Sequence, residues 1–234
     1  MIGRAVAFAA VVAAFVIAVL PEGLDAHGVS GRDAWFLQFI DGPAIGPFMY
    51  LGAKHMVTGY DHLLFLVGVI FFLYRLEDVV VYVSLFTLGH SLTLLLGVLG
   101  KVHADAFLID AIIGLSIVYK AFENMGGFDR LLGFEPNARA AVMTFGLFHG
   151  FGLATKLQEF GISANGLVTN IVSFNVGVEI GQALALTAVL IAISYWRLRP
   201  GFLTHAFATN TALMTGGFIL TGVQLVGYFR QSLA

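Results

Sequence analysis

The sequence predicts an all-α, polytopic membrane protein with about six transmembrane helices that follow a cleaved signal peptide. Hydrophobic residues make up 59% of the 234-residue chain, charged residues only 11%, and the mean hydropathy is +0.90. A water-soluble surface can hardly be built from such a composition. The apolar residues also form long runs separated by short polar breaks, and the first run lies at the N-terminus.

Residues 1–26 have the pattern of a secretory signal peptide. Arg4 supplies a positive charge, residues 5–20 are apolar, and Ala26 is a small residue at a suitable cleavage position. An uncleaved first span is the alternative, because the apolar stretch is near the lower limit of about 17 residues for a crossing. Cleavage would leave His27 at the mature N-terminus, where its amine and imidazole could chelate a metal, although a solvated terminal histidine is the simpler interpretation.

After the signal peptide, residues 27–46 are expected to form a short extracytoplasmic segment and residues 47–234 a six-helix transmembrane domain. The apolar runs place the spans at 48–74, 79–99, 105–124, 138–156, 166–195 and 207–229. The first run is too long for one straight crossing, since at about 1.5 Å per residue it exceeds a hydrocarbon core of about 30 Å. Gly59 is the expected break within it.

Charges in the connections predict the topology. Alternate connections carry either arginines or lysines: Arg75, Arg130, Arg139, Arg197 and Arg199 on one side, and Lys101 and Lys156 on the other. The positive-inside rule makes the arginine side cytoplasmic, which puts both mature termini on the extracytoplasmic side of the cell inner membrane. The net charge of −2 and the absence of a basic run argue against nucleic-acid binding.

Several ionisable side chains fall inside the apolar runs. There an Asp costs about 2.5 kcal/mol or more, so such residues usually mark an ion path or a metal site. Asp61 and His62 lie in the first run, His90 and His149 fall near the middle of the second and fourth spans, and Glu179 lies in the fifth. A single intramembrane histidine often only hydrogen-bonds to a neighbouring helix, but three at similar depth with two carboxylates favour one shared ion site.

The donor types indicate a divalent transition metal. Imidazole and carboxylate ligands suit Ni²⁺, Co²⁺, Cu²⁺ and Zn²⁺, and the chain has no cysteine to provide a thiolate. We expect His62, His90 and His149 to bind the ion. Asp61 would orient an imidazole or bind directly, and Glu179 would neutralise cation charge. Other polar residues that could support the site, or simply pack, are Asn175, Gln182, Asp110, His55 and Ser91.

Two local patterns predict helix packing and charge pairing. Gly146-x3-Gly150 and Gly177-x3-Gly181 have the small-residue spacing that lets helices approach closely, which would bring His149 and Glu179 near their partners. Lys120 and Glu123, one turn apart in the third span, are expected to form an interfacial ion pair.

Four motifs in order resemble the HupE/UreJ family over nearly the whole mature chain. They are Gly59-Tyr60-Asp61-His62, Phe86-Thr87-Leu88-Gly89-His90-Ser91, Phe145-Gly146-Leu147-Phe148-His149-Gly150 and Phe174-Asn175-Val176-Gly177-Val178-Glu179. The resemblance implies a permease for nickel, or for cobalt or another transition metal, that accompanies hydrogenase and urease maturation. It also implies metalloenzyme maturation proteins as partners, beside the metal ion and the lipid bilayer.

A looser similarity links the chain to the nickel/cobalt transporter family. Leu88-Gly89-His90-Ser91 matches the second signature of that family, but the first signature is His-x4-Asp-His, whereas His55-x5-Asp61-His62 has one extra residue here. On a continuous helix that insertion rotates His55 by about 100° relative to the pair, so His55 is an uncertain ligand.

Two other function classes stay open. A membrane-embedded zinc hydrolase could use three histidines and a carboxylate around Zn²⁺, with another carboxylate activating water. A metal-binding accessory subunit for metalloenzyme maturation would hold the ion without moving it across the membrane. Metal uptake into liposomes separates a permease from both.

Overall fold

The computed structural model describes residues 39–159 and 162–233, and every regular element in those ranges is a helix. The described part of the chain is therefore all-α, as the apolar runs predict. The predicted signal peptide, its cleavage site and His27 lie outside the described residues.

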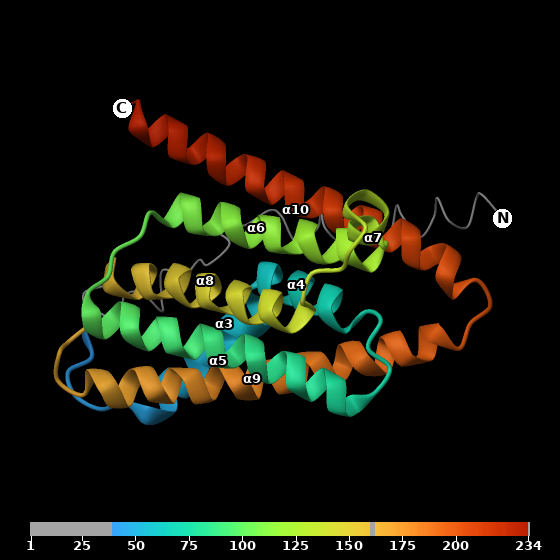
Figure 1. Ribbon diagram of the computed structural model, residues 1–234. Helices are drawn as coiled ribbons and strands as arrows, with labels where there is room; N and C mark the ends of the chain where they lie inside the picture. The colour runs from blue at the N-terminus through green and yellow to red at the C-terminus, as the bar shows by residue number, and fades with distance from the viewer. Residues whose placement is uncertain (1–38, 160–161, 234) are drawn as a thin grey trace.

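In the described ranges the chain forms eight helices (Figure 1). They are α3 Ile45–Thr58, α4 Tyr60–Ile70, α5 Leu76–Gly100, α6 Ala106–Asn124, α7 Gly127–Leu132, α8 Ala138–Glu159, α9 Leu167–Arg197 and α10 Phe202–Ser232.

Within the described residues, four helices are long and apolar enough to cross a membrane, namely α5, α8, α9 and α10. They correspond to the predicted spans 79–99, 138–156, 166–195 and 207–229. The predicted span 105–124 forms the 19-residue α6, which carries three charged side chains and does not count with these four. The number of membrane passes, six by the sequence, stays a prediction.

The long first run breaks at Gly59, as the sequence predicts. Helix α3 ends directly before Gly59 and α4 begins directly after it, and the Gly59 backbone is extended with φ −73° and ψ 91°. A Cβ at Gly59 would lie 3.1 Å from His62 Nδ1 and 3.3 Å from Asp61 Oδ1. The missing side chain therefore makes room for two polar side chains that lie close to the break.

Three closely packed helix pairs make up most of the described structure: α5 with α8, α6 with α10, and α3 with α9. Glycines bring their backbones into contact. A Cβ at Gly150 would overlap the carbonyl of His90, and one at Gly177 would overlap the carbonyl of Met49. The packing role predicted for the two small-residue motifs is confirmed.

The pairs differ in direction (Figure 1). Helices α5 and α8 run parallel, since Gly146 meets Phe86 and Gly150 meets His90, and α3 and α9 are parallel as well. Helices α6 and α10 run antiparallel. These directions agree with a chain that alternates across a membrane if α3 and α4 together make one pass.

The short helix α4 contacts members of all three pairs. Its C-terminal end is held by side chains of two other helices: Arg197 Nη2 donates to the carbonyls of Ile70 and Phe71 at 2.8 and 2.7 Å, and Asn124 Nδ2 donates to Gly68 O at 2.8 Å. Backbone N–H groups of Phe71 and Leu73 also reach the carbonyls of Gly68 and Ile70, so the side-chain donors complete the hydrogen bonding of the buried carbonyls at this helix end.

Beside α4, Lys120 and Glu123 form the predicted ion pair, with Nζ and Oε2 2.8 Å apart. The pair is more enclosed than the interfacial position that we expected, because the two side chains are only 9% and 16% exposed. Close packing explains this: a Cβ at Gly68 of α4 would lie 3.2 Å from Lys120 Cγ.

Candidate metal centre

His62 on α4 lies at the centre of a group of four histidines. Its ring centroid is 4.8 Å from that of His149, 5.0 Å from that of His55 and 5.8 Å from that of His90. The three neighbours belong to α8, α3 and α5. His62, His90 and His149 are at most 1% exposed, and His55 is half-buried. We call these four residues the histidine cluster.

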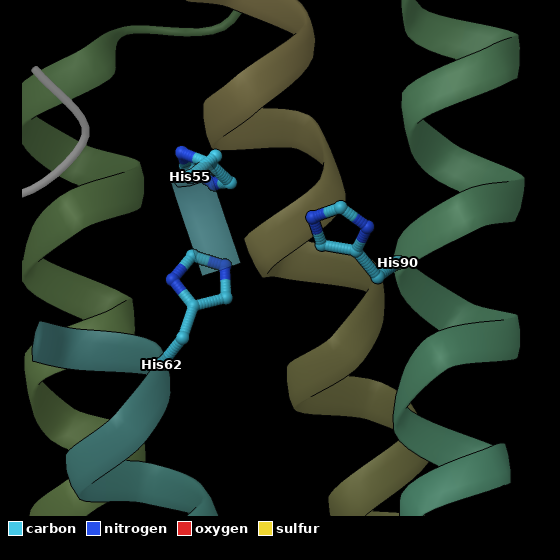
Figure 2. A group of neighbouring side chains, drawn as sticks. All are labelled: His55, His62 and His90. Atoms are coloured by element: carbon cyan, nitrogen blue, oxygen red, sulfur yellow. The ribbon is translucent and has the colours of Figure 1, made fainter. Parts of the chain in front are cut away.

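Three members of the histidine cluster could close on one ion. His55, His62 and His90 each offer a ring nitrogen, and these nitrogens all lie within 4.8 Å of one another. Figure 2 shows the three side chains projecting from three helices toward a shared space. Nitrogens bound to one ion at about 2.1 Å can be no more than about 4.2 Å apart, so small ring rotations would complete the coordination.

Two histidines of the cluster are oriented by oxygen acceptors. His149 Nδ1 lies 2.7 Å from Phe145 O, and His62 Nδ1 lies 3.1 Å from Asp61 Oδ1. Carbonyl and carboxylate oxygens only accept hydrogen bonds, so a neutral imidazole held in this way carries its hydrogen on Nδ1, and Nε2 is then the atom that can bind a metal. This support is common for metal-binding histidines, and for Asp61 it agrees with the orienting role that we expected.

Asp61 also places beside the cluster a carboxyl group that can carry a negative charge. Its side chain is 1% exposed and lies directly beside His62. A divalent cation moved out of water into a buried site needs such compensation, because an uncompensated charge there costs several kcal/mol or more.

Aromatic rings close the cluster on the side toward the C-terminal end of α4. Phe65, one turn after His62, has its ring 5.5 Å from His149, 5.4 Å from Phe86 and 5.7 Å from Phe145. Phe65 and Phe86 are fully buried. We call these three phenylalanines the phenylalanine layer. An ion leaving in this direction would have to displace it.

The contact between α5 and α8 fixes where His90 and His149 stand. Thr93 Oγ1 donates to Leu147 O at 2.7 Å across the pair. Gly150 directly follows His149 and packs against the His90 backbone. Two of the four histidines are thus positioned by one tightly packed interface.

His55 joins the cluster although the sequence made it an uncertain ligand. The rotation of His55 away from Asp61 and His62 applies only to a continuous helix, and the helix breaks at Gly59. The His55 ring instead stands at 78° to the His62 ring, edge toward face. The sequence feature that pointed to this arrangement was Gly59, which lies between His55 and Asp61.

Glu179 occupies a different setting from the cluster. Its side chain is exposed on α9, and with Gln182 and Ser91 it lines an open groove between α9 and α5. Asn175, one turn earlier, is half-buried and donates from Nδ2 to Ile171 O at 3.2 Å. The grouping of Glu179 with the histidines therefore rests on the sequence alone.

Asp110 takes part in an ion pair. Its Oδ2 lies 3.2 Å from Lys156 Nζ, and the two side chains are 5% and 15% exposed. The pair links α6 to α8, and it gives the buried carboxylate a cation from the chain itself.

Comparison with known proteins gives one family. The family model described as HupE / UreJ protein matches residues 32–232. Neither the curated proteins nor the solved structures gave a match.

Proposed function

This chain belongs to the HupE/UreJ family, and on that premise we propose that it is a membrane permease for a divalent transition metal. Nickel is the first candidate, followed by cobalt, with zinc and copper as alternatives. The observation that carries the proposal is the convergence of four histidines from four helices, with the Asp61 carboxylate beside them.

The donor set suits this class of ion. Imidazole nitrogens and a carboxylate favour borderline metals such as Ni²⁺, Co²⁺, Cu²⁺ and Zn²⁺ over Mg²⁺ or Ca²⁺, which prefer oxygen. We propose His62, His90 and His149 as ligands, with His55 as a fourth. Asp61 orients His62 and balances part of the ion's charge.

The same arrangement suits transport. Ligands on four separate helices hold an ion only while those helices keep their relative positions, so a shift of one helix changes the affinity. Helix α4 is the candidate for that movement, since it is short, is hinged at Gly59 and carries both His62 and Phe65. Its shift would open the phenylalanine layer and weaken the site together.

Uptake into liposomes tests the proposal. Liposomes that contain the purified chain should accumulate Ni²⁺ in a saturable manner, and His62→Ala should abolish it. His103→Ala is the matched control, because His103 is exposed in the connection between α5 and α6. Competition with Co²⁺, Zn²⁺ and Cu²⁺ ranks the metals.

Two outcomes would contradict a permease. Tight metal binding without uptake would favour the accessory subunit, and metal-dependent hydrolysis of an added ester or peptide would favour the zinc enzyme. Either outcome would leave the family assignment unchanged.

A further inference from the structure

We propose that the groove between α5 and α9 is a second cation site, built from oxygen ligands and suited to sodium. This site differs from the transition-metal site in its ligands, its location and its ion. We call it the oxygen groove. Its volume is about 500 Å³, and its polar lining consists of Ser84, Thr87, Ser91, Glu179 and Gln182.

The oxygen groove follows from helical spacing. Ser84, Thr87 and Ser91 are three and four residues apart, so their side chains share one face of α5. Glu179 and Gln182 are three apart and share one face of α9. The two polar faces lie opposite each other along the groove, although both helices are long enough to cross a membrane.

Hydrogen bonding indicates which atom of Gln182 faces the oxygen groove. Thr87 Oγ1 lies 3.1 Å from Val83 O and 3.0 Å from Gln182 Oε1, but a hydroxyl has one hydrogen to donate. Among the described residues Gln182 Nε2 has no hydrogen-bond partner, although the side chain is only 1% exposed. Exchanging the two amide atoms removes this conflict, because Nε2 then donates to Thr87 and Thr87 donates to Val83. Gln182 Oε1 is then the buried amide atom left to accept a ligand.

Charge decides the class of ion. Glu179 lies about 18 Å along α9 from its first residue, well inside a span, where an ionised carboxylate needs a cation. No lysine or arginine lines the oxygen groove in the part of the chain that the structure describes. One carboxylate balances one positive charge, so a monovalent ion leaves the site neutral and a divalent ion leaves it charged in a poorly polar environment. Carboxylate, amide and hydroxyl oxygens are the ligands of hard cations.

The oxygen groove and the histidine cluster are neighbours on α5. Ser91 directly follows His90, so the two sites lie on adjacent faces of one helix, about 100° apart. A sodium ion bound by both α5 and α9 would stabilise the position of α5, which carries His90. This link to transport rests on the proposed function, whereas the sodium site itself does not.

Binding of radioactive ²²Na⁺ to the purified full chain in lipid nanodiscs, without transition metal, tests the proposal. We expect one saturable site per chain. Glu179→Gln should weaken sodium binding about tenfold or more because it removes the charge, and Ser91→Ala about threefold or more because it removes a ligand. Glu77→Gln is the matched control, since that carboxylate is 80% exposed and paired with Arg75. It should bind sodium as the unaltered chain does.

Three results would overturn the sodium site. They are no saturable binding by the unaltered chain, equal binding by Glu179→Gln and Glu77→Gln, and displacement of sodium by an equal concentration of Mg²⁺. Should Glu179→Gln fail to fold, Ser91→Ala decides in the same way. The His62→Ala variant should still bind sodium. Failure of the permease proposal and failure of the sodium-site proposal can therefore be distinguished.

Discussion

The histidine cluster and the oxygen groove are adjacent on α5 but differ in chemistry and enclosure. The cluster gathers nitrogen donors from four helices, is buried, and is closed by the phenylalanine layer. The groove gathers oxygen atoms from two helices and is open along one side. Consecutive residues, His90 and Ser91, border the two regions, so in the two proposals one turn of α5 serves two kinds of ion. The two residues have nearly the same depth in the membrane, so the kind of ion depends more on the face of α5 than on the depth.

The largest expected effect separates the two regions completely. Replacing His62 by Ala removes the central ligand, so we expect Ni²⁺ affinity to fall about a hundredfold or more while sodium binding is unchanged. Adding His90→Ala should cost little more, because residues that share one ion are not additive. Isothermal titration with Ni²⁺ measures both variants, and independent losses that multiply would mean separate histidines.

A second change should damage both regions at once. Gly150→Ala places a Cβ against the His90 carbonyl, which pushes α8 away from α5 and shifts His90 and Ser91 together. We expect a lower melting temperature and several-fold weaker binding of both ions. Gly216→Ala is the matched control, because nothing lies within 4 Å of the added Cβ. If the two variants melted alike, the packing account of the α5–α8 interface would be wrong.

The smallest expected effect sharpens the comparison within the cluster. A Cβ at Gly59 would lie 2.9 Å from His55 O, 3.1 Å from His62 Nδ1 and 3.3 Å from Asp61 Oδ1, so Gly59→Ala should shift the end of α3 together with this pair by a few tenths of an ångström. We expect Ni²⁺ affinity to drop about threefold to tenfold, since ligand orientation depends on that pair. Sodium affinity should not change, and a matching sodium loss would show that the break at Gly59 controls the whole fold.

Much of the fold could be predicted because membrane helices leave a strong pattern. Long apolar runs gave the positions of α5, α8, α9 and α10, a glycine gave the break between α3 and α4, and small-residue motifs gave the closest contacts. The case of α6 was harder. Its charged residues are paired. Lys120 pairs with Glu123 within α6, which the spacing predicts, but Asp110 pairs with Lys156 of α8, and pairing between different helices leaves no local trace in a sequence.

The candidate site was predicted in part, for the same reason. Three of the histidines could be brought together from depth alone. Depth does not say which way a side chain points. Glu179 borders the oxygen groove, and its grouping with the histidines stays a prediction from the sequence. His55 was predicted to be an uncertain ligand because its rotation was calculated for a continuous helix, whereas α3 stops at Gly59. Both points depend on how helices are turned relative to one another, which is decided by their packing.

The attachment of Arg197 to the end of α4 has a mechanical consequence. Helix α4 is about 16 Å long, joined to α3 at Gly59 and clasped by Arg197 through the carbonyls of Ile70 and Phe71. A helix that is attached at both ends can rotate about its own axis more easily than it can slide along that axis. A side chain reaches about 5 to 6 Å from the helix axis, so a swivel of about 30° would carry the His62 ring about 3 Å, enough to release a bound ion. For the proposed permease we therefore expect α4 to release the ion by rotating about its own axis while it stays at one depth in the bilayer.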